Sequence, residues 1–128
     1  LSSAKAQAIA NPDMVAKIPF EFSVGDKTLP AGEYPVRCIN PNSSTKVLQI
    51  RSKTGSARAL VMTDSVSGKI KENALLIFFR YGNEYFFTQA WMPANSVGLQ
   101  APRSKALKAL ELAREKRETE TVVASMRP

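Results

Sequence analysis

The segment that constrains the fold most runs from Ile18 to Arg37 and reads IPFEFSVGDKTLPAGEYPVR. Apolar and polar residues alternate over residues 16–24, which is the period of a half-buried β-strand. Gly25-Asp26 is typical of a two-residue hairpin turn with glycine first, and residues 29–32 have the proline and glycine of a type I turn. The segment therefore predicts a strand, two tight turns and a second strand, and one face of that second strand carries Tyr34, Val36 and Cys38.

Residues 74–91 predict an aromatic hairpin that is apolar on both faces, so other parts of the chain must cover both faces. The rest of the sheet is expected to supply one cover and a C-terminal helix the other. The first strand contains Pro19, which has no N–H to donate, so this strand is expected at a sheet edge, or with the missing donor facing outward. Beyond the first segment, strands are predicted over residues 45–51, 57–63, 74–81 and 84–91, with Gly82-Asn83 as a second hairpin turn.

The C-terminal helix is expected to begin after Pro102, with Ser104 as its N-cap, and to extend over about residues 104–118. Its apolar stripe is long enough for about three turns to pack. Residues 119–128 are expected to fray, and residues 1–13 are expected to be a flexible leader. The stripe consists of Ala106, Leu107, Ala109, Leu110 and Ala113.

Together these elements predict an all-β fold. We expect six to seven antiparallel strands in a small barrel or sandwich, plus one C-terminal α-helix packed on it. The chain has 128 residues, which suits a single domain, placed here at residues 14–118. No apolar run approaches the ~18 residues of a membrane-spanning helix, so no transmembrane segment is expected.

The chain contains no histidine and one cysteine, Cys38, which removes several classes of active site. Histidine-dependent nucleophiles, general bases and zinc sites are excluded. An enzyme of this sequence would depend on carboxylates or a Ser/Lys pair, and no carboxylate pair has a spacing that suggests acid–base work. We therefore expect no catalytic residues, no cofactor and no metal, and we expect Cys38 to be a buried core thiol.

The net charge is +7, which favours anionic partners such as phospholipid head groups, acidic glycans or nucleic acid. The competing interpretation is an ordinary solvated basic surface, because the excess charge is distributed along the chain. Arg103, Lys105 and Lys108 at the start of the predicted helix oppose the helix dipole, which favours acids there. These three residues are candidate contacts for an anionic partner.

A second group of candidate contacts combines basic and aromatic side chains around the last hairpin. Such groups can stack on bases or sugars. The sequence does not match the RNP1 pattern of RNA-binding sheets, and no nucleic-acid partner is expected. Packing in the core and at its rim is the competing interpretation for these residues, which are Arg80, Tyr81, Tyr85 and Trp91.

Residues 18–34 resemble the shared motif IPFxFxVG…LPAGEYxV of an uncharacterised family of small exported bacterial proteins. The resemblance covers about residues 15–118 and includes the aromatic hairpin and the charged C-terminal helix. It implies export to the periplasm or the extracellular space, and Ala6-Gln7-Ala8 matches the end of a removed secretory signal. The family has no established catalytic residues. Pro35 lies where the family commonly has a residue that donates a hydrogen bond to a neighbouring strand. The resemblance therefore does not predict strand pairing at that position.

These observations favour a non-enzymatic exported protein with a binding or structural role in the cell envelope. The alternative is a carrier of a small apolar or amphipathic ligand inside a β-barrel. The partner would then be either an anionic envelope component or a small apolar molecule. The carrier hypothesis predicts that some of the large apolar side chains line a cavity and do not fill a core, namely Phe20, Phe22, Leu76, Phe78 and Phe86.

Overall fold

The computed structural model describes residues 13–126 and contains more strands than the six to seven expected. The expected leader therefore lies outside the described residues except for Asp13, as do the last two residues of the expected tail. The one helix within residues 13–126 is α2 (Lys105–Leu112). The strands are β1 (Met14–Ile18), β2 (Phe22–Val24), β3 (Lys27–Leu29), β4 (Gly32–Cys38), β5 (Lys46–Arg51), β6 (Arg58–Ser67), β7 (Ala74–Tyr81), β8 (Glu84–Trp91), β9 (Val97–Gln100) and β10 (Glu118–Met126).

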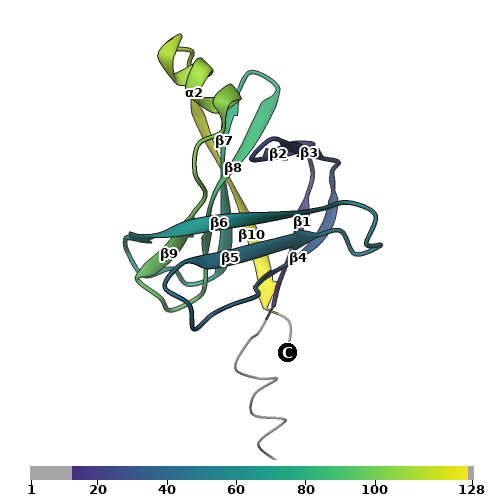
Figure 1. Ribbon diagram of the computed structural model, residues 1–128, viewed down its shortest axis with the longest axis vertical. Coiled ribbons are helices and arrows are strands. Elements are labelled where there is room, and N and C mark those ends of the chain that lie inside the picture. Colours follow the sequence, from purple (N-terminus) through teal and green to yellow (C-terminus); the bar gives the residue numbers. More distant parts are fainter. Residues whose placement is uncertain (1–12, 127–128) are drawn as a thin grey trace, which may run out of the picture.

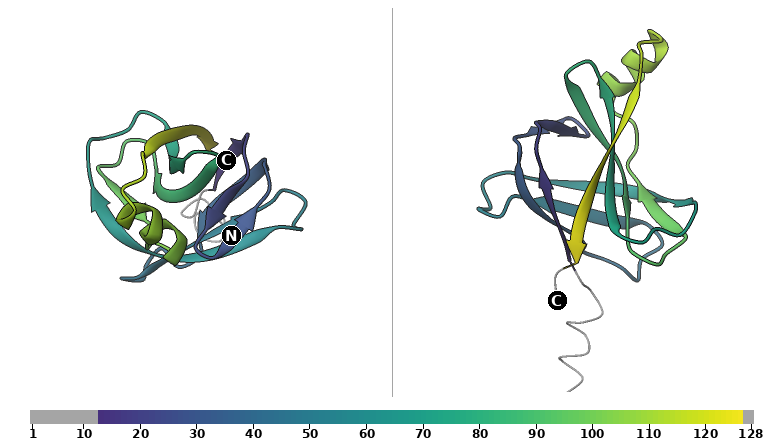
Figure 2. Two further views of the ribbon diagram at one scale, coloured as in Figure 1. Left: turned by 90° about the horizontal axis from the view of Figure 1, so that it is seen from above. Right: turned by 180° about the vertical axis from the view of Figure 1, so that it is seen from behind.

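Eight of these strands form a closed antiparallel barrel (Figures 1 and 2). The order around the barrel is β8-β7-β10-β1-β4-β5-β6-β9, and β9 pairs with β8 to complete the ring. The structure is thus a barrel and not a sandwich. Strands β2 and β3 form a short hairpin outside the ring, and β2 pairs with β8 in parallel. A barrel of eight strands has an interior that side chains can fill or that can hold one small ligand.

Strand β10 corrects the expectation that residues 119–128 fray. It lies between β1 and β7, with Ala124 opposite Ala74 and Ser125 opposite Val15. In Figure 2 it runs as the long yellow strand beside β1 and β7. Its centre is rich in β-branched residues, which suit a pleated sheet, and Val122 and Ala124 face the core while Val123 is exposed.

The predicted strand over residues 16–24 is divided in two. Strand β1 ends at Ile18, and the chain changes partners over residues 19–21 before β2 begins. Because β1 has β4 on one side and β10 on the other, the expectation of an edge strand is wrong. Pro19 lies just beyond β1, where its missing N–H interrupts no ladder. Strand β4 pairs with β1 through Pro35, which lies opposite Val15, so the proline leaves this pairing intact.

Both predicted hairpin turns are confirmed. Gly25 has φ +59° between β2 and β3, and Gly82 has φ +61° between β7 and β8. Backbone conformations of this kind favour glycine, because a side chain would be strained there. The pairs Val24↔Lys27 and Tyr81↔Glu84 close the two turns.

Helix α2 begins as predicted and ends earlier than expected. The Ser104 hydroxyl accepts a hydrogen bond from the Leu107 N–H at 3.2 Å, which confirms Ser104 as the N-cap. The helix ends at Leu112, about six residues before the expected end. Arg114 takes a left-handed conformation with φ +57°, which ends the helix before β10 begins at Glu118. Only Leu107 is buried, so most of the predicted stripe is exposed. The helix covers the outer face of the β7–β8 tip, where Leu107 packs with Tyr81 and Phe86.

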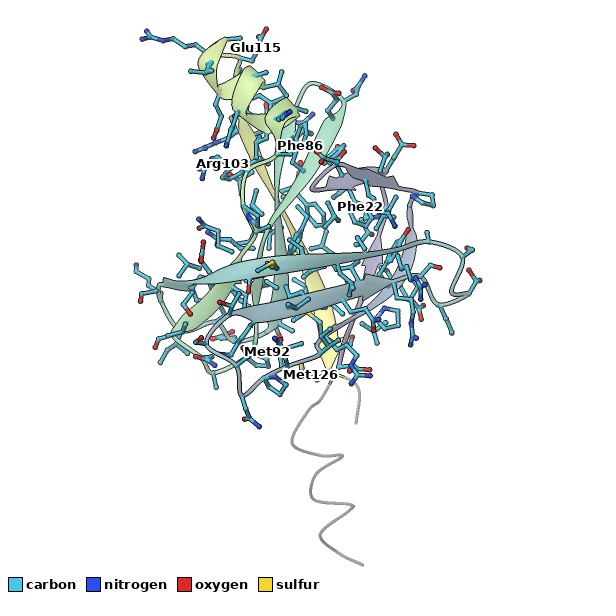
Figure 3. All side chains as sticks on the ribbon, in the orientation of Figure 1. Phe22, Phe86, Met92, Arg103, Glu115 and Met126 are labelled. Atoms are coloured by element: carbon cyan, nitrogen blue, oxygen red, sulfur yellow. The ribbon has the colours of Figure 1, made fainter. Side chains whose placement is uncertain are left out.

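An aromatic cluster fills the barrel near the β2–β3 hairpin. The ring of Phe78 meets those of Phe22 and Phe87 edge to face, with centroids 5.5 and 5.9 Å apart. Phe22 in turn meets Tyr34, with centroids 5.2 Å apart, and Figure 3 labels Phe22 in this region. Edge-to-face packing of this kind is a favoured aromatic geometry. This end of the barrel is therefore solid, and we call it the closed end.

The register of β10 can be tested with two adjacent aspartates. We expect Ala124→Asp to lower the free energy of unfolding by about 3 kcal/mol or more, because the carboxylate would be buried without a partner. Val123→Asp on the same strand should cost about 1 kcal/mol or less, since residue 123 is 61% exposed. Urea unfolding measures both. A one-residue slip of the strand would exchange the two effects.

The pH dependence of stability provides a second test. Burial raises the pKa of the Tyr34 phenol, whose hydroxyl donates to the Pro30 carbonyl at 2.6 Å. The unfolded chain therefore loses this proton first, so the contribution is complete below about pH 10 and declines as pH rises further. Urea unfolding from about pH 8 to about pH 11 should show a steeper loss for the wild type than for Tyr34→Phe. Equal slopes would contradict the burial of this phenol.

Candidate functional site

The end of the barrel opposite the closed end contains a cavity of about 480 Å³. Figure 3 places Met92, one of the lining residues, at this lower end of the molecule, far from Phe86 at the upper end. The walls come from β1, β4, β5, β6, β8 and β9, and from the loops that connect β4 with β5 and β8 with β9. We call this feature the barrel cavity.

Inward-facing side chains of β7 and β8 become smaller toward this end of the barrel. On β7 the inward residues change from Phe78 through Leu76 to Ala74. On β8 the inward residue changes from Phe87 at the closed end to Ala90, which lines the cavity. A small inward side chain such as Ala90 leaves space that a large one would fill.

The walls of the barrel cavity are mainly apolar. Met14, Val36 and Leu48 are buried core residues whose side chains also form its inner surface. Such walls suit the apolar part of a small molecule. The apolar lining residues are Met14, Val36, Pro41, Leu48, Ala90, Met92, Val97, Gly98 and Leu99.

The charged residues that line the cavity are basic. Lys46 shares one face of β5 with Leu48 and Ile50, which point inward, so Lys46 also belongs to the interior face. Its ammonium donates to the Ser43 carbonyl at 3.3 Å, and none of the ion pairs among the described residues includes it. Arg37, the other lining cation, lies 3.9 Å from the Asp13 carboxylate. The remaining polar lining residues are Cys38, Ser65 and Asn95.

A second hollow of about 550 Å³ lies between the β2–β3 turn and the β5–β6 wall. Its lining includes the charged residues Asp26, Lys27 and Arg58, and the Lys27 ammonium already donates to the Arg58 carbonyl at 3.0 Å. Gln49 and Leu60 on the outer face of the barrel also contribute. The barrel cavity is the better candidate, because residues from six barrel strands converge on it and its walls are apolar.

The hairpin residues expected to contact a partner lie at the closed end and outside the barrel cavity. Tyr81 is buried beneath α2, and Tyr85 stacks on Phe20 with ring centroids 3.8 Å apart. Arg80 forms an ion pair with Glu118 and lies 3.6 Å from the Glu120 carboxylate. These contacts favour the packing interpretation for this hairpin. The structure also shows that the large apolar residues predicted to line a cavity fill the core or lie under α2, as Phe78 and Phe86 do.

Trp91 is separated from the other aromatic candidates by the length of β8 and lies on the outer side of the barrel wall. It is 3% exposed, packed against Gly68 and Gly98. Its indole N–H donates to the Gln89 side chain at 2.9 Å, and the Lys71 ammonium lies 4.2 Å from its ring centroid. Trp91 is therefore a packing residue of the outer wall.

The three basic candidates on the helix lie together at the upper end of the molecule. Arg103 forms an ion pair with Glu111 at 2.8 Å, which ties the segment before the helix to its last turn. Lys105 and Lys108 are exposed on α2. The structure thus brings these three residues together and leaves the two lysines accessible.

The sequence predicted a ligand cavity inside a barrel only as an alternative, and it did not identify the residues that line this one. One available signal was Lys46, a charged residue in phase with the buried positions of its strand. Ser65 gives the same signal on β6, where it follows buried Val61 and Thr63. A polar residue on the interior face of a barrel strand marks a place where the interior is not solid.

Among residues 13–126, no cluster of three or more acidic or cysteine side chains could hold a metal ion. Within the same range, no helix has the length and apolar character needed to cross a lipid bilayer. Comparison with protein-family models, curated proteins and solved structures finds no match to this chain. The candidate site therefore rests on the geometry of the barrel cavity.

The packing role of Trp91 can be tested through Gly98. A Cβ at this position would lie 2.6 Å from the Trp91 ring, so we expect Gly98→Ala to lower the free energy of unfolding by about 1–3 kcal/mol. Gly32→Ala is the matched control, because its Cβ would meet nothing closer than 3.7 Å. Its expected change is within about 0.5 kcal/mol. Equal effects in urea unfolding would show that the ring does not lie against Gly98.

Proposed function

We propose that this chain is a non-enzymatic binding protein that carries a small amphipathic ligand in the barrel cavity. The observation that supports this most directly is an opening of about 480 Å³ at the end of a closed eight-stranded barrel. Ligand sites in proteins have volumes of roughly 300–1,000 Å³ and mostly apolar walls with a few polar groups. The barrel cavity meets both conditions.

The lining indicates the chemistry of the ligand. An apolar body would lie against Met14, Val36 and Leu48 inside the barrel. A polar or acidic head would lie at the rim, near the Lys46 ammonium. An acidic head is favoured over a basic one because the charged lining residues of the described chain, Arg37 and Lys46, are both cationic.

This proposal places the carrier role ahead of a purely structural role in the envelope. A structural component would not need an open interior, and filling it with larger side chains would be stabilising. The absence of histidine from the sequence supports a binding role over an enzymatic one. Export to the periplasm or the extracellular space belongs to the same proposal, and the resemblance of residues 18–34 to exported bacterial proteins supports it.

The proposal is tested with a cavity-filling variant and an anionic amphipathic probe, anilinonaphthalene sulfonate. Ser65 lines the cavity and is exposed, so Ser65→Trp should fill the space without loss of the fold. We expect the wild type to bind one probe molecule in isothermal titration calorimetry. Ser65→Trp should weaken that affinity about tenfold or more, because bulk replaces the space for the apolar body.

Ser67→Trp is the matched control, since Ser67 is exposed on the same strand and does not line the cavity. It should retain wild-type affinity. If Ser65→Trp and Ser67→Trp bind the probe as tightly as the wild type, the barrel cavity is not the binding site.

A further inference from the structure

The upper end of the molecule carries much of the net charge of the chain. Residues 103–117, which we call the basic apex, contain six basic and two acidic side chains, a net charge of +4 out of +7. Figure 1 shows α2 projecting beyond the barrel at this end, and Figure 3 labels Arg103 and Glu115 there. The basic residues are Arg103, Lys105, Lys108, Arg114, Lys116 and Arg117.

The carboxylates around the apex reduce this charge without cancelling it. With Arg80, Glu84, Glu118 and Glu120 included, the net charge falls from +4 to +2. Glu111 is paired with Arg103, and Glu118 at the start of β10 is paired with Arg80. Glu115 and Glu84 are the other nearby carboxylates, and none of the ion pairs among residues 13–126 includes them. Lys105 and Lys108 of α2 therefore form part of a cationic surface that is exposed to solvent.

The same surface presents an apolar group. Leu112 is 84% exposed, which is the highest value among the exposed large hydrophobic residues of the described chain. At helical spacing, Leu112 lies above Lys105 and Lys108, while Leu107 on the opposite side anchors the helix to the barrel. The outward face of α2 thus combines two ammonium groups with one leucine.

The local charge pattern is unfavourable for an isolated helix. Lys105 and Lys108 lie in the first turn and Glu111 lies in the last, so these charges oppose the helix dipole. A helix of eight residues is also marginal on its own. An anionic surface against the apex would relieve the repulsion between the first-turn lysines and the helix N-terminus.

We propose that the basic apex docks on the surface of a membrane containing acidic phospholipids. Phosphate groups would receive the Lys and Arg side chains, and Leu112 would enter the boundary between head groups and acyl chains. The exposed leucine favours a lipid surface over a soluble acidic polymer, which would offer it no apolar environment. Because Met92 of the barrel cavity lies at the opposite end (Figure 3), docking would leave the cavity mouth facing away from the bilayer.

Vesicle flotation with the full chain tests this proposal. Vesicles of phosphatidylcholine with about 30% phosphatidylglycerol should bind the protein, and pure phosphatidylcholine vesicles should not. Binding should weaken between ~50 and ~200 mM salt. The double variant Lys105→Gln/Lys108→Gln should lower the partition coefficient about tenfold or more, and Leu112→Ser should lower it about fivefold.

The matched control is Lys17→Gln/Lys69→Gln, which removes the same charge from exposed positions away from the apex. It should bind acidic vesicles like the wild type, and circular dichroism should show the same fold for all variants. Equal losses in the two double variants would show that binding follows net charge alone and would overturn the proposal. Leu112→Ser without effect, together with full competition by soluble polyglutamate, would assign the apex to an acidic polymer and would also overturn it.

Discussion

The fold depends on the backbone pairing of β10 between β1 and β7. Without it, both neighbouring strands would expose an unpaired edge, and the interior would open along its length. Its pairing joins the two ends of the described chain and so closes a loop of more than a hundred residues, which has an entropic cost that grows slowly with length. Burial of apolar residues where β10 pairs with β7, such as Val122 opposite Leu76, offsets that cost.

Closure also explains why the two ends of the barrel differ. The circumference is set by eight strands, so the size of inward side chains decides whether a level is solid or open. Phe22, Phe78 and Phe87 fill one end, and the smaller Ala90 lines the cavity at the other end. The proposed ligand site and the proposed membrane contact thus occupy opposite ends of one rigid scaffold.

Local features were predictable from residues that act through the backbone. Gly25 and Gly82 predict turns because of their freedom at positive φ, and Ser104 predicts a helix start because its hydroxyl can accept an N–H. The pairing of strands that are distant in the sequence was not predictable in this way. The segment over residues 118–126 has strand-forming residues, but its place at the end of the chain, after a charged helix, favoured a frayed tail. Its partners, β1 and β7, are distant in sequence and give no local signal.

The sequence by itself determined the strand periodicity, the tight turns, the helix cap and the lack of histidine chemistry, because these depend on single residues and their neighbours. Only the tertiary structure decided that β10 closes the barrel, that Pro19 divides one predicted strand between two partners, and that Trp91 packs on the outer wall. It also decided where space remains, since a cavity is the volume left when side chains from β1, β4, β5, β6, β8 and β9 meet. The volume of the cavity therefore depends on strand order and register, which the periodicity of the sequence does not determine.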